Sequence, residues 1–175
     1  MKNMRLSSTP LPDEMELLGD GQTFQDTILS MLMNAKGFES FDTADLKFLA
    51  NHMKAYHVNE DATIFREGDH NSYLCVLIEG RVCVYKEDHN KENKLLTIIP
   101  PGRIFGEISI IDNFPYSASI IAETEATFLL MSREGFRQCI DERPVLGVRL
   151  LSLIARLLCA RLRSASGQLV EYIDI

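Results

Sequence analysis

The sequence predicts a mainly β fold: an antiparallel jelly-roll β-barrel with helices before it and a long helix after it. Short segments rich in β-branched and aromatic residues follow one another between about residues 54 and 132. Turn residues separate them, and none is followed by a helical pattern long enough for a parallel crossover connection. Amphipathic helical patterns lie on both sides of this β region.

The N-terminal part divides into a tail and two helices. Residues 1–20 hold Ser, Thr, two prolines and scattered acids, which predict a flexible tail. Residues 21–175 are expected to form one domain. Apolar residues at helical spacing predict a first helix over Phe24–Ala35. Asp42 is a suitable N-cap for a second helix, whose apolar face includes Leu46 and Leu49.

The barrel, at about 54–132, is predicted from its strands and from the turns between them. The expected strands are Tyr56–Val58, Thr63–Phe65, Tyr73–Ile78, Arg81–Lys86, Leu95–Ile99, Ser119–Ala122 and Thr127–Met131. The turn signals are Glu67-Gly68-Asp69, Glu79-Gly80, the polar loop Asp88–Asn93 and Pro100-Pro101-Gly102.

The chain after the barrel, about 133–172, is predicted to be helical. Ser132 can cap a short helix that runs to Ile140, and Pro144 suits the first turn of a long helix. Leucines of the long helix recur at alternating spacings of four and three, which is a heptad pattern. This seam is Leu146, Leu150, Leu153, Leu157 and Ala160, and a second stripe is Leu151, Ile154 and Leu158. One stripe can pack on the barrel while the other meets a partner helix; alternatively, both cover the barrel.

Composition excludes several classes of protein. The net charge of −7 argues against a surface dedicated to nucleic acid, which needs clustered Lys and Arg. No apolar run is long enough for a membrane span, and the N-terminus has no hydrophobic signal region, so we expect a cytoplasmic protein. The four cysteines lack the spacing of a zinc site and are expected to be buried thiols.

An enzymatic function is not expected. Cupin-like barrels hold metals with clustered histidines, but His52, His57, His70 and His89 contain no HxH pair. No nucleophile-base motif is present either. We therefore predict no catalytic residue, no metal site and no bound cofactor.

The stretch Phe105–Ile120 contains the candidate ligand site. Gly106 has no side chain, so a ligand can approach its backbone closely. The turn that follows offers the N–H groups of Glu107, Ile108 and Ser109, which can bind an anion such as phosphate. The Glu107 carboxylate can accept hydrogen bonds from a sugar hydroxyl, and Ser117 adds a hydroxyl and an amide.

Several segments in this order resemble the cyclic-nucleotide-binding domain family. They are Ile64–Asp69, Leu77–Val82, Pro101–Glu107, the phosphate-binding cassette Phe105–Ile120, and Phe136–Arg163. The resemblance covers about residues 38–165. It implies a regulatory sensor of cyclic AMP or cyclic GMP, in which the positions of Glu107 and Ser117 bind the ribose 2′-hydroxyl and the cyclic phosphate. The implied ligand-binding residues are Phe105, Gly106, Glu107, Ile108, Ser109, Tyr116, Ser117 and Ala118.

Tyr116 stands where this family usually places an arginine that contacts the phosphate. Loss of such a charge-assisted contact weakens binding by roughly tenfold to more than a hundredfold. A basic residue of the last helix could replace it, with Arg149, Arg156, Arg161 and Arg163 as candidates. Tyr116 could instead fill the phosphate subsite or select a less charged ligand. The C-terminal segment Leu169–Ile175 could also occupy the pocket, as in some channel members of the family.

The resemblance also implies partners. In relatives such as the catabolite activator protein, the long helix forms a homodimer axis and supplies a hydroxyl to the nucleotide base, for which Ser166 is the nearest match. Those relatives continue into a DNA-binding domain, whereas this sequence ends at Ile175. We therefore expect a homodimer that signals through an effector protein, without direct contact to nucleic acid or membrane. The alternative function is a dimerisation or protein-interaction module whose pocket is degenerate or self-occupied.

Overall fold

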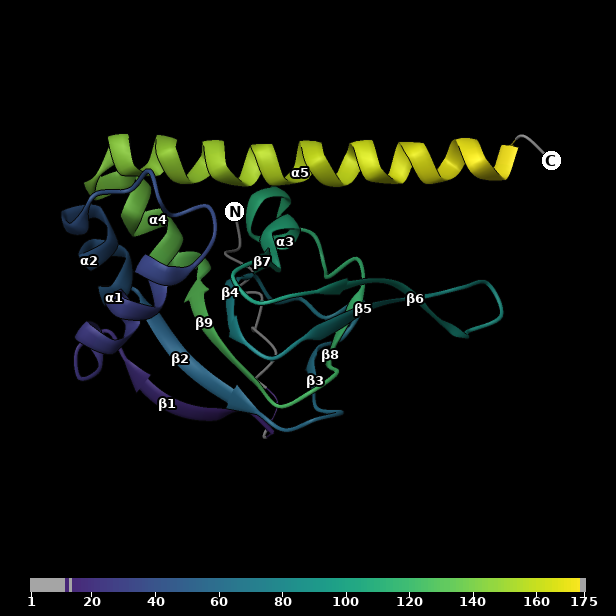
Figure 1. Ribbon diagram of the computed structural model, residues 1–175, viewed down its shortest axis with the longest axis horizontal. Coiled ribbons are helices and arrows are strands. Elements are labelled where there is room, and N and C mark those ends of the chain that lie inside the picture. The colour runs from purple at the N-terminus through teal and green to yellow at the C-terminus, as the bar shows by residue number, and fades with distance from the viewer. Residues whose placement is uncertain (1–11, 13, 174–175) are drawn as a thin grey trace, which may run out of the picture. The chain divides into compact units, whose positions relative to one another are not determined.

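Two antiparallel β-sheets form the β region of the computed structural model, which describes residue 12 and residues 14–173 (Figure 1). One sheet has the strand order β1-β2-β9-β4-β7 and the other has the order β3-β8-β5-β6. The strands are β1 (Glu16–Asp20), β2 (Met53–Val58), β3 (Thr63–Phe65), β4 (Tyr73–Glu79), β5 (Val82–Glu87), β6 (Asn93–Ile99), β7 (Ile104–Phe105), β8 (Ser119–Ala122) and β9 (Ala126–Ser132). The predicted fold class, mainly antiparallel β with flanking helices, is confirmed.

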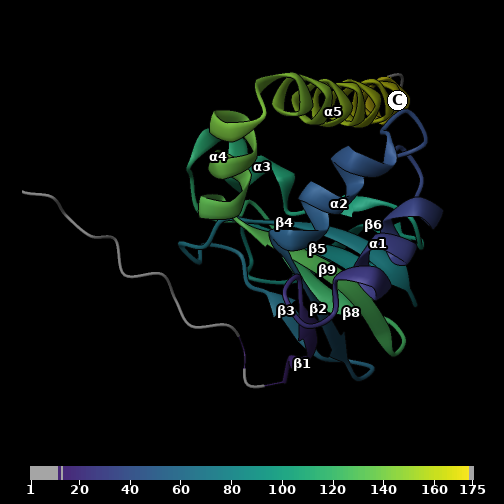
Figure 2. The same ribbon diagram turned by 90° about the vertical axis from the view of Figure 1, so that its left-hand side faces the viewer.

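Five helices accompany the sheets within the described residues, and the chain divides into two compact units. The helices are α1 (Gln25–Asn34), α2 (Thr43–Asn51), α3 (Glu107–Asp112), α4 (Arg133–Glu142) and α5 (Pro144–Ile173). The first unit extends to Arg137 and the second begins at Gln138. Figures 1 and 2 both show α1 and α2 beside β2, within the first unit.

Strand β1 corrects the predicted N-terminal tail, which is wrong for Glu16–Asp20. This strand pairs antiparallel with β2, with Glu16 opposite His57 and Asp20 opposite Lys54. Its leucines, Leu17 and Leu18, remain exposed. Backbone hydrogen bonds therefore define this edge strand, and its side chains give no alternating pattern that the sequence could reveal. Residues 1–11 and 13 of the predicted tail lie outside the described residues.

Both predicted N-terminal helices are confirmed. In α1, Ile28 and Leu32 are fully buried, as their spacing of four residues requires. The side chain of Asp42 caps α2 by accepting a hydrogen bond from the Asp45 N–H at 2.8 Å. The predicted apolar face of α2 is buried at Leu46 and Leu49.

The predicted strands are confirmed with small changes at their ends, and one further strand besides β1 is present. β2 pairs with β9 along its whole length, from Met53 opposite Met131 to Val58 opposite Ala126. The additional strand, β7, has two residues and pairs with β4, so that Phe105 lies opposite Cys75. Because β7 is so short, only this pairing with β4 marks it as a strand.

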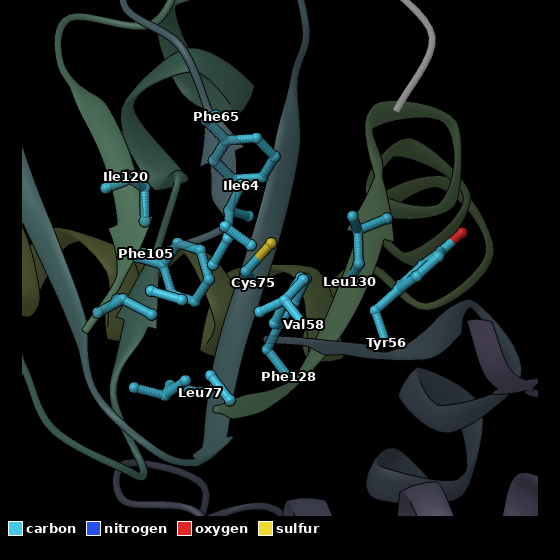
Figure 3. Packing of buried hydrophobic residues seen from close by; sticks show 14 of the residues in the cluster. Tyr56, Val58, Ile64, Phe65, Cys75, Leu77, Phe105, Ile120, Phe128 and Leu130 are labelled. Atoms are coloured by element: carbon cyan, nitrogen blue, oxygen red, sulfur yellow. The ribbon is translucent and has the colours of Figure 1, made fainter. Parts of the chain in front are cut away.

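An aromatic core joins the two sheets and supports the segment after β7. Side chains of both sheets, including Phe128 of β9 and Ile64 of β3, belong to one buried cluster. Figure 3 shows Phe105, Ile64 and Cys75 close together between the strands. The Phe105 ring meets the Phe128 ring edge-on at 5.7 Å between centroids, and it lies 6.0 Å from the Phe65 ring. These contacts fix the start of the cassette to the core.

The helices after the sheets begin as predicted. The Ser132 hydroxyl caps α4 by accepting a hydrogen bond from the Gly135 N–H at 3.2 Å. α5 starts at Pro144 and continues to Ile173, one residue beyond the predicted end. Its buried apolar side chains are Leu146, Leu150 and Ile154, which are four residues apart. Leu153 and Leu157 of the predicted seam are half-buried and Ala160 is exposed, so burial in α5 does not follow the heptad seam.

Candidate ligand-binding site

The cassette Phe105–Ile120 has the predicted local structure of a short helix followed by a return to a strand. Gly106 precedes α3 in the left-handed conformation, with φ at 75°. Asn113, also left-handed with φ at 64°, ends the helix, and its N–H donates to the Ser109 carbonyl at 3.2 Å. The chain then enters β8, which pairs with β5 and β3. The candidate ligand-binding residues thus lie in one continuous segment that starts at β7 and leads into β8.

Gly106 is required by the close approach of β4. A Cβ atom at this position would lie 2.5 Å from the Tyr73 carbonyl oxygen and 3.3 Å from the Phe65 ring. Both the positive φ and this contact exclude larger residues. The sequence suggested that the glycine admits a ligand; in this structure the protein's own backbone fills the space beside it.

Within the cassette, Glu107 and Ser109 are buried, whereas Ile108 between them is exposed at 40%. The Ser109 hydroxyl donates to the Gly106 carbonyl at 3.2 Å, which closes the first turn of α3. Burial and, second, the nearby Glu107 carboxylate raise the pKa of the Cys75 thiol well above its usual value. Cys75 is therefore a neutral, unreactive part of the core.

The Tyr116 side chain points into the core. Its ring stacks on Phe65 at 4.4 Å between centroids, and Phe65 in turn stacks on Tyr73 at 6.1 Å. Its main chain is tied to the loop after β3, because its N–H donates to the Asp69 carbonyl and its carbonyl accepts from the Gly68 N–H. Tyr116 is 6% exposed and belongs to the same buried cluster as Phe105 and Phe128.

The Tyr116 hydroxyl is buried. It lies near the Tyr73 main chain and the Ser109 side chain, yet it makes no hydrogen bond of ordinary geometry within the described chain. Burial, followed by the influence of Cys75 and Tyr73, raises the pKa of Tyr116 far above that of a free tyrosine. The side chain is therefore neutral at physiological pH and carries no charge of either sign toward a ligand.

We expect the Tyr116→Phe variant to be more stable than the wild type by about 1 kcal/mol, because a buried hydroxyl without a hydrogen bond is costly. The corresponding rise in melting temperature is about 2–4 °C for a chain of this length. Thermal denaturation followed by circular dichroism measures it. The matched control is Tyr73→Phe in the same aromatic stack, for which we expect no gain. A marked loss of stability in Tyr116→Phe would show that the hydroxyl has a partner in solution.

Lys86 of β5 contacts the cassette at Ser117, a contact that sequence reasoning missed. Its ammonium group donates to the Ser117 carbonyl at 2.8 Å and forms an ion pair with Glu67. The hydrogen bond from Lys86 and that from the Glu87 N–H lower the pKa of Glu67. Ser117 itself is exposed, and the Glu67 N–H donates to the hydroxyl of Ser119 at 2.9 Å. This contact depends on the pairing of β5 with β8. The register of that pairing is not visible in the sequence, so the contact could not be predicted from it.

The other site residues that were predicted from the sequence remain predictions. Arg149, Arg156, Arg161, Arg163 and Ser166 all lie on α5 in the second unit. Of the C-terminal segment, residues 174–175 and the side chains from Glu171 onward lie outside the described residues.

The described residues also bear on metal binding and on membrane insertion. No group of three or more His, Cys, Asp or Glu side chains there is arranged to hold a metal ion. No helix in the same residues is long and apolar enough to cross a membrane. The cysteines are free thiols, of which Cys159 is exposed and the others are buried.

The two antiparallel sheets, with a short helix and a returning strand after β7, are those of a jelly-roll domain. Residues 56–143 match the family model described as the cyclic nucleotide-binding domain. The chain belongs to this family, whose members are non-catalytic regulatory domains.

Known relatives agree with this assignment. The chain is 29% identical over 143 residues to the CRP-like cAMP-activated global transcriptional regulator of Mycobacterium tuberculosis, covering 82% of this chain and 62% of that protein. It is 31% identical over 106 residues to the cyclic AMP receptor protein of Thermus thermophilus, covering 61% of this chain and 47% of that protein. The chain thus matches less than two thirds of the length of either relative.

A solved structure covers more of the chain. The crystal structure of a cyclic nucleotide-binding domain from Methylobacillus flagellatus is 30% identical, with a TM-score of 0.77. It covers 89% of this chain and 87% of that chain. The fold is therefore shared over most of the sequence.

Proposed function

We propose that this domain is a non-catalytic, cytoplasmic sensor that binds a cyclic nucleotide, cyclic AMP or cyclic GMP, at the cassette Phe105–Ile120. The observation that supports this proposal best is the cassette conformation, with left-handed Gly106, buried Glu107 and Ser117 at the return to β8. In the family, the positions of Glu107 and Ser117 contact the ribose and the phosphate. The same positions would do so here.

Lys86 would supply the positive charge that Tyr116 lacks. Its ammonium group already contacts the Ser117 carbonyl, so a phosphate bound at Ser117 would lie within its reach. The ion pair with Glu67 competes for this ammonium group. An ammonium also provides a point charge without the two parallel donors of arginine. We therefore expect weaker binding than in members of the family that have the arginine.

Opposite effects of two substitutions test this role. Lys86→Gln should weaken cyclic nucleotide binding about tenfold, because a charge-assisted contact is lost. Glu67→Gln should strengthen binding severalfold, because it releases Lys86 from its ion pair. Isothermal titration calorimetry with cyclic AMP and cyclic GMP measures both affinities. Lys94→Gln, which removes a lysine of β6 paired with Glu92 and Asp88, is the charge-matched control.

The possible results separate the proposed function from the role of Lys86. Absence of saturable binding by the wild type at millimolar cyclic nucleotide would contradict the function itself. Binding by the wild type that is equal in Lys86→Gln and Lys94→Gln would contradict only the role of Lys86.

The burial of Tyr116 favours a second candidate function, a dimerisation or protein-interaction module with a self-occupied pocket. In the present conformation the Tyr116 ring fills core space beside the cassette. Such a module would form a homodimer through the members of the predicted seam of α5 that are not already buried in the chain, Leu153, Leu157 and Ala160, or bind an effector protein, independently of nucleotide. Light scattering after size-exclusion chromatography distinguishes the two functions, because a monomer that responds to nucleotide contradicts the second one.

A further inference from the structure

A cavity of about 350 Å³ lies beside the cassette helix, and neither Ser117 nor Lys86 lines it. It is bordered by the loop that enters β4, by the residues after α3 and by the start of α4. The lining residues are His70, Asn71, Ser72, Tyr73, Asn113, Phe114, Ser132, Arg133 and Glu134. None of these is a predicted ligand-binding residue of the cassette, and the volume lies within the range of small-molecule sites.

The guanidinium group of Arg133 lies at this cavity without a counter-ion. Its Nη2 atom donates to the Ser72 hydroxyl at 3.0 Å and to the Ser109 carbonyl at 2.6 Å, both of which are neutral acceptors. Within the part of the chain that the structure describes, no carboxylate lies within ion-pair distance of it. Arg133 is half-buried, and a guanidinium group has five N–H donors. Donors therefore remain for an anion.

Asn71 provides a second, independent sign of a missing ligand. The residue is 5% exposed and lines the same cavity. Its side-chain carbonyl oxygen is buried and accepts no hydrogen bond from the described residues. A buried acceptor of this kind is unfavourable unless a donor satisfies it. The cavity thus combines donors for an anion with an acceptor that needs a hydroxyl or N–H group.

We propose that this cavity binds a small organic phosphate that carries hydroxyl groups, at a site separate from the cyclic nucleotide site. Arg133 and the His70 imidazole would bind the phosphate, and the Asn71 carbonyl would accept a hydrogen bond from a ligand hydroxyl. Phe114, which is 70% exposed, would cover the carbon skeleton. Glu134 is exposed at the same cavity, and its negative charge opposes an anion and limits the affinity.

Calorimetric titration with glucose 6-phosphate and with inorganic phosphate tests the proposal. We expect saturable binding of glucose 6-phosphate by the wild type and weaker binding of inorganic phosphate, which leaves Asn71 and Phe114 without contacts. Arg133→Gln should weaken binding of glucose 6-phosphate at least tenfold. Glu134→Gln should strengthen it severalfold, because a like charge is removed. Lys94→Gln on β6 controls for the general loss of positive charge.

Three results would overturn the proposal. The first is no saturable binding of glucose 6-phosphate by the wild type up to about 10 mM, the weakest affinity of interest. The second is an affinity of Glu134→Gln equal to that of the wild type; this variant changes an exposed side chain and so remains informative even if Arg133→Gln fails to fold. The third is binding that is lost in Lys86→Gln and retained in Arg133→Gln, because the phosphate would then occupy the cassette.

Discussion

Replacing Tyr116 with arginine is expected to destabilise the domain without ligand and to make cyclic AMP or cyclic GMP stabilise it strongly. The Tyr116 ring lies in the core, stacked on Phe65, so a guanidinium group there would be buried among apolar side chains. The cost of such a charge is roughly 3 kcal/mol. A cyclic phosphate would neutralise it, and a ligand at a hundred times its dissociation constant stabilises by about 2.7 kcal/mol.

Thermal denaturation with and without each nucleotide measures both effects. Tyr116→Met is the matched control, because it removes the aromatic ring without adding a charge, and it should show no gain in nucleotide response. An arginine variant that is as stable as the wild type would show that the guanidinium group reaches solvent. An arginine variant that is destabilised and does not respond to nucleotide would show that Glu107 and Ser117 no longer form a binding site.

Replacing Gly106 with alanine is expected to be the most damaging small substitution in the cassette. The added methyl group would lie 2.5 Å from the Tyr73 carbonyl oxygen, and the backbone has a φ of +75° that disfavours side chains. Together the clash and the left-handed conformation should lower the free energy of unfolding by roughly 3 kcal/mol or more. Urea denaturation measures this loss.

The Gly68→Ala variant separates the cost of the left-handed conformation from the cost of the steric clash. Gly68 has a φ of +85°, and an added Cβ would meet nothing within 4 Å. This variant should therefore show only the conformational cost, about 1–2 kcal/mol. Equal losses in the two variants would contradict the assigned role of the contact between Gly106 and Tyr73. A preserved cassette in Gly106→Ala would require β4 and β7 to separate.

The fold was predictable because its strands and turns are local features. Turn residues such as Glu79-Gly80 and caps such as Asp42 act within a few residues, so the sequence places them directly. Strands β1 and β7 were missed because each depends on a partner distant in the sequence. β7 has two residues, and β1 buries neither of its leucines, so neither shows an alternating pattern.

The backbone conformation of the candidate site was predictable from the sequence, whereas the side-chain contacts around it were less so. The motif around Gly106 and Glu107 predicted the turn, and the substitution at Tyr116 marked the unusual position. The contacts of Lys86 and Arg133 were not predictable, because the former depends on the β5–β8 register and the latter on how the start of α4 meets Ser109. These contacts arise from tertiary structure, which no spacing along the chain encodes.

The pairing of β1 with β2 has a consequence for preparing this protein. β1 covers one edge of β2, whose other edge is paired with β9. A chain shortened to begin at residue 21 would leave the backbone N–H and C=O groups of β2 open to solvent. Open edges of this kind pair with other molecules and promote aggregation. Strand β1 (Glu16–Asp20) thus protects the solubility of the domain, and a shortened chain that begins after it should aggregate more readily.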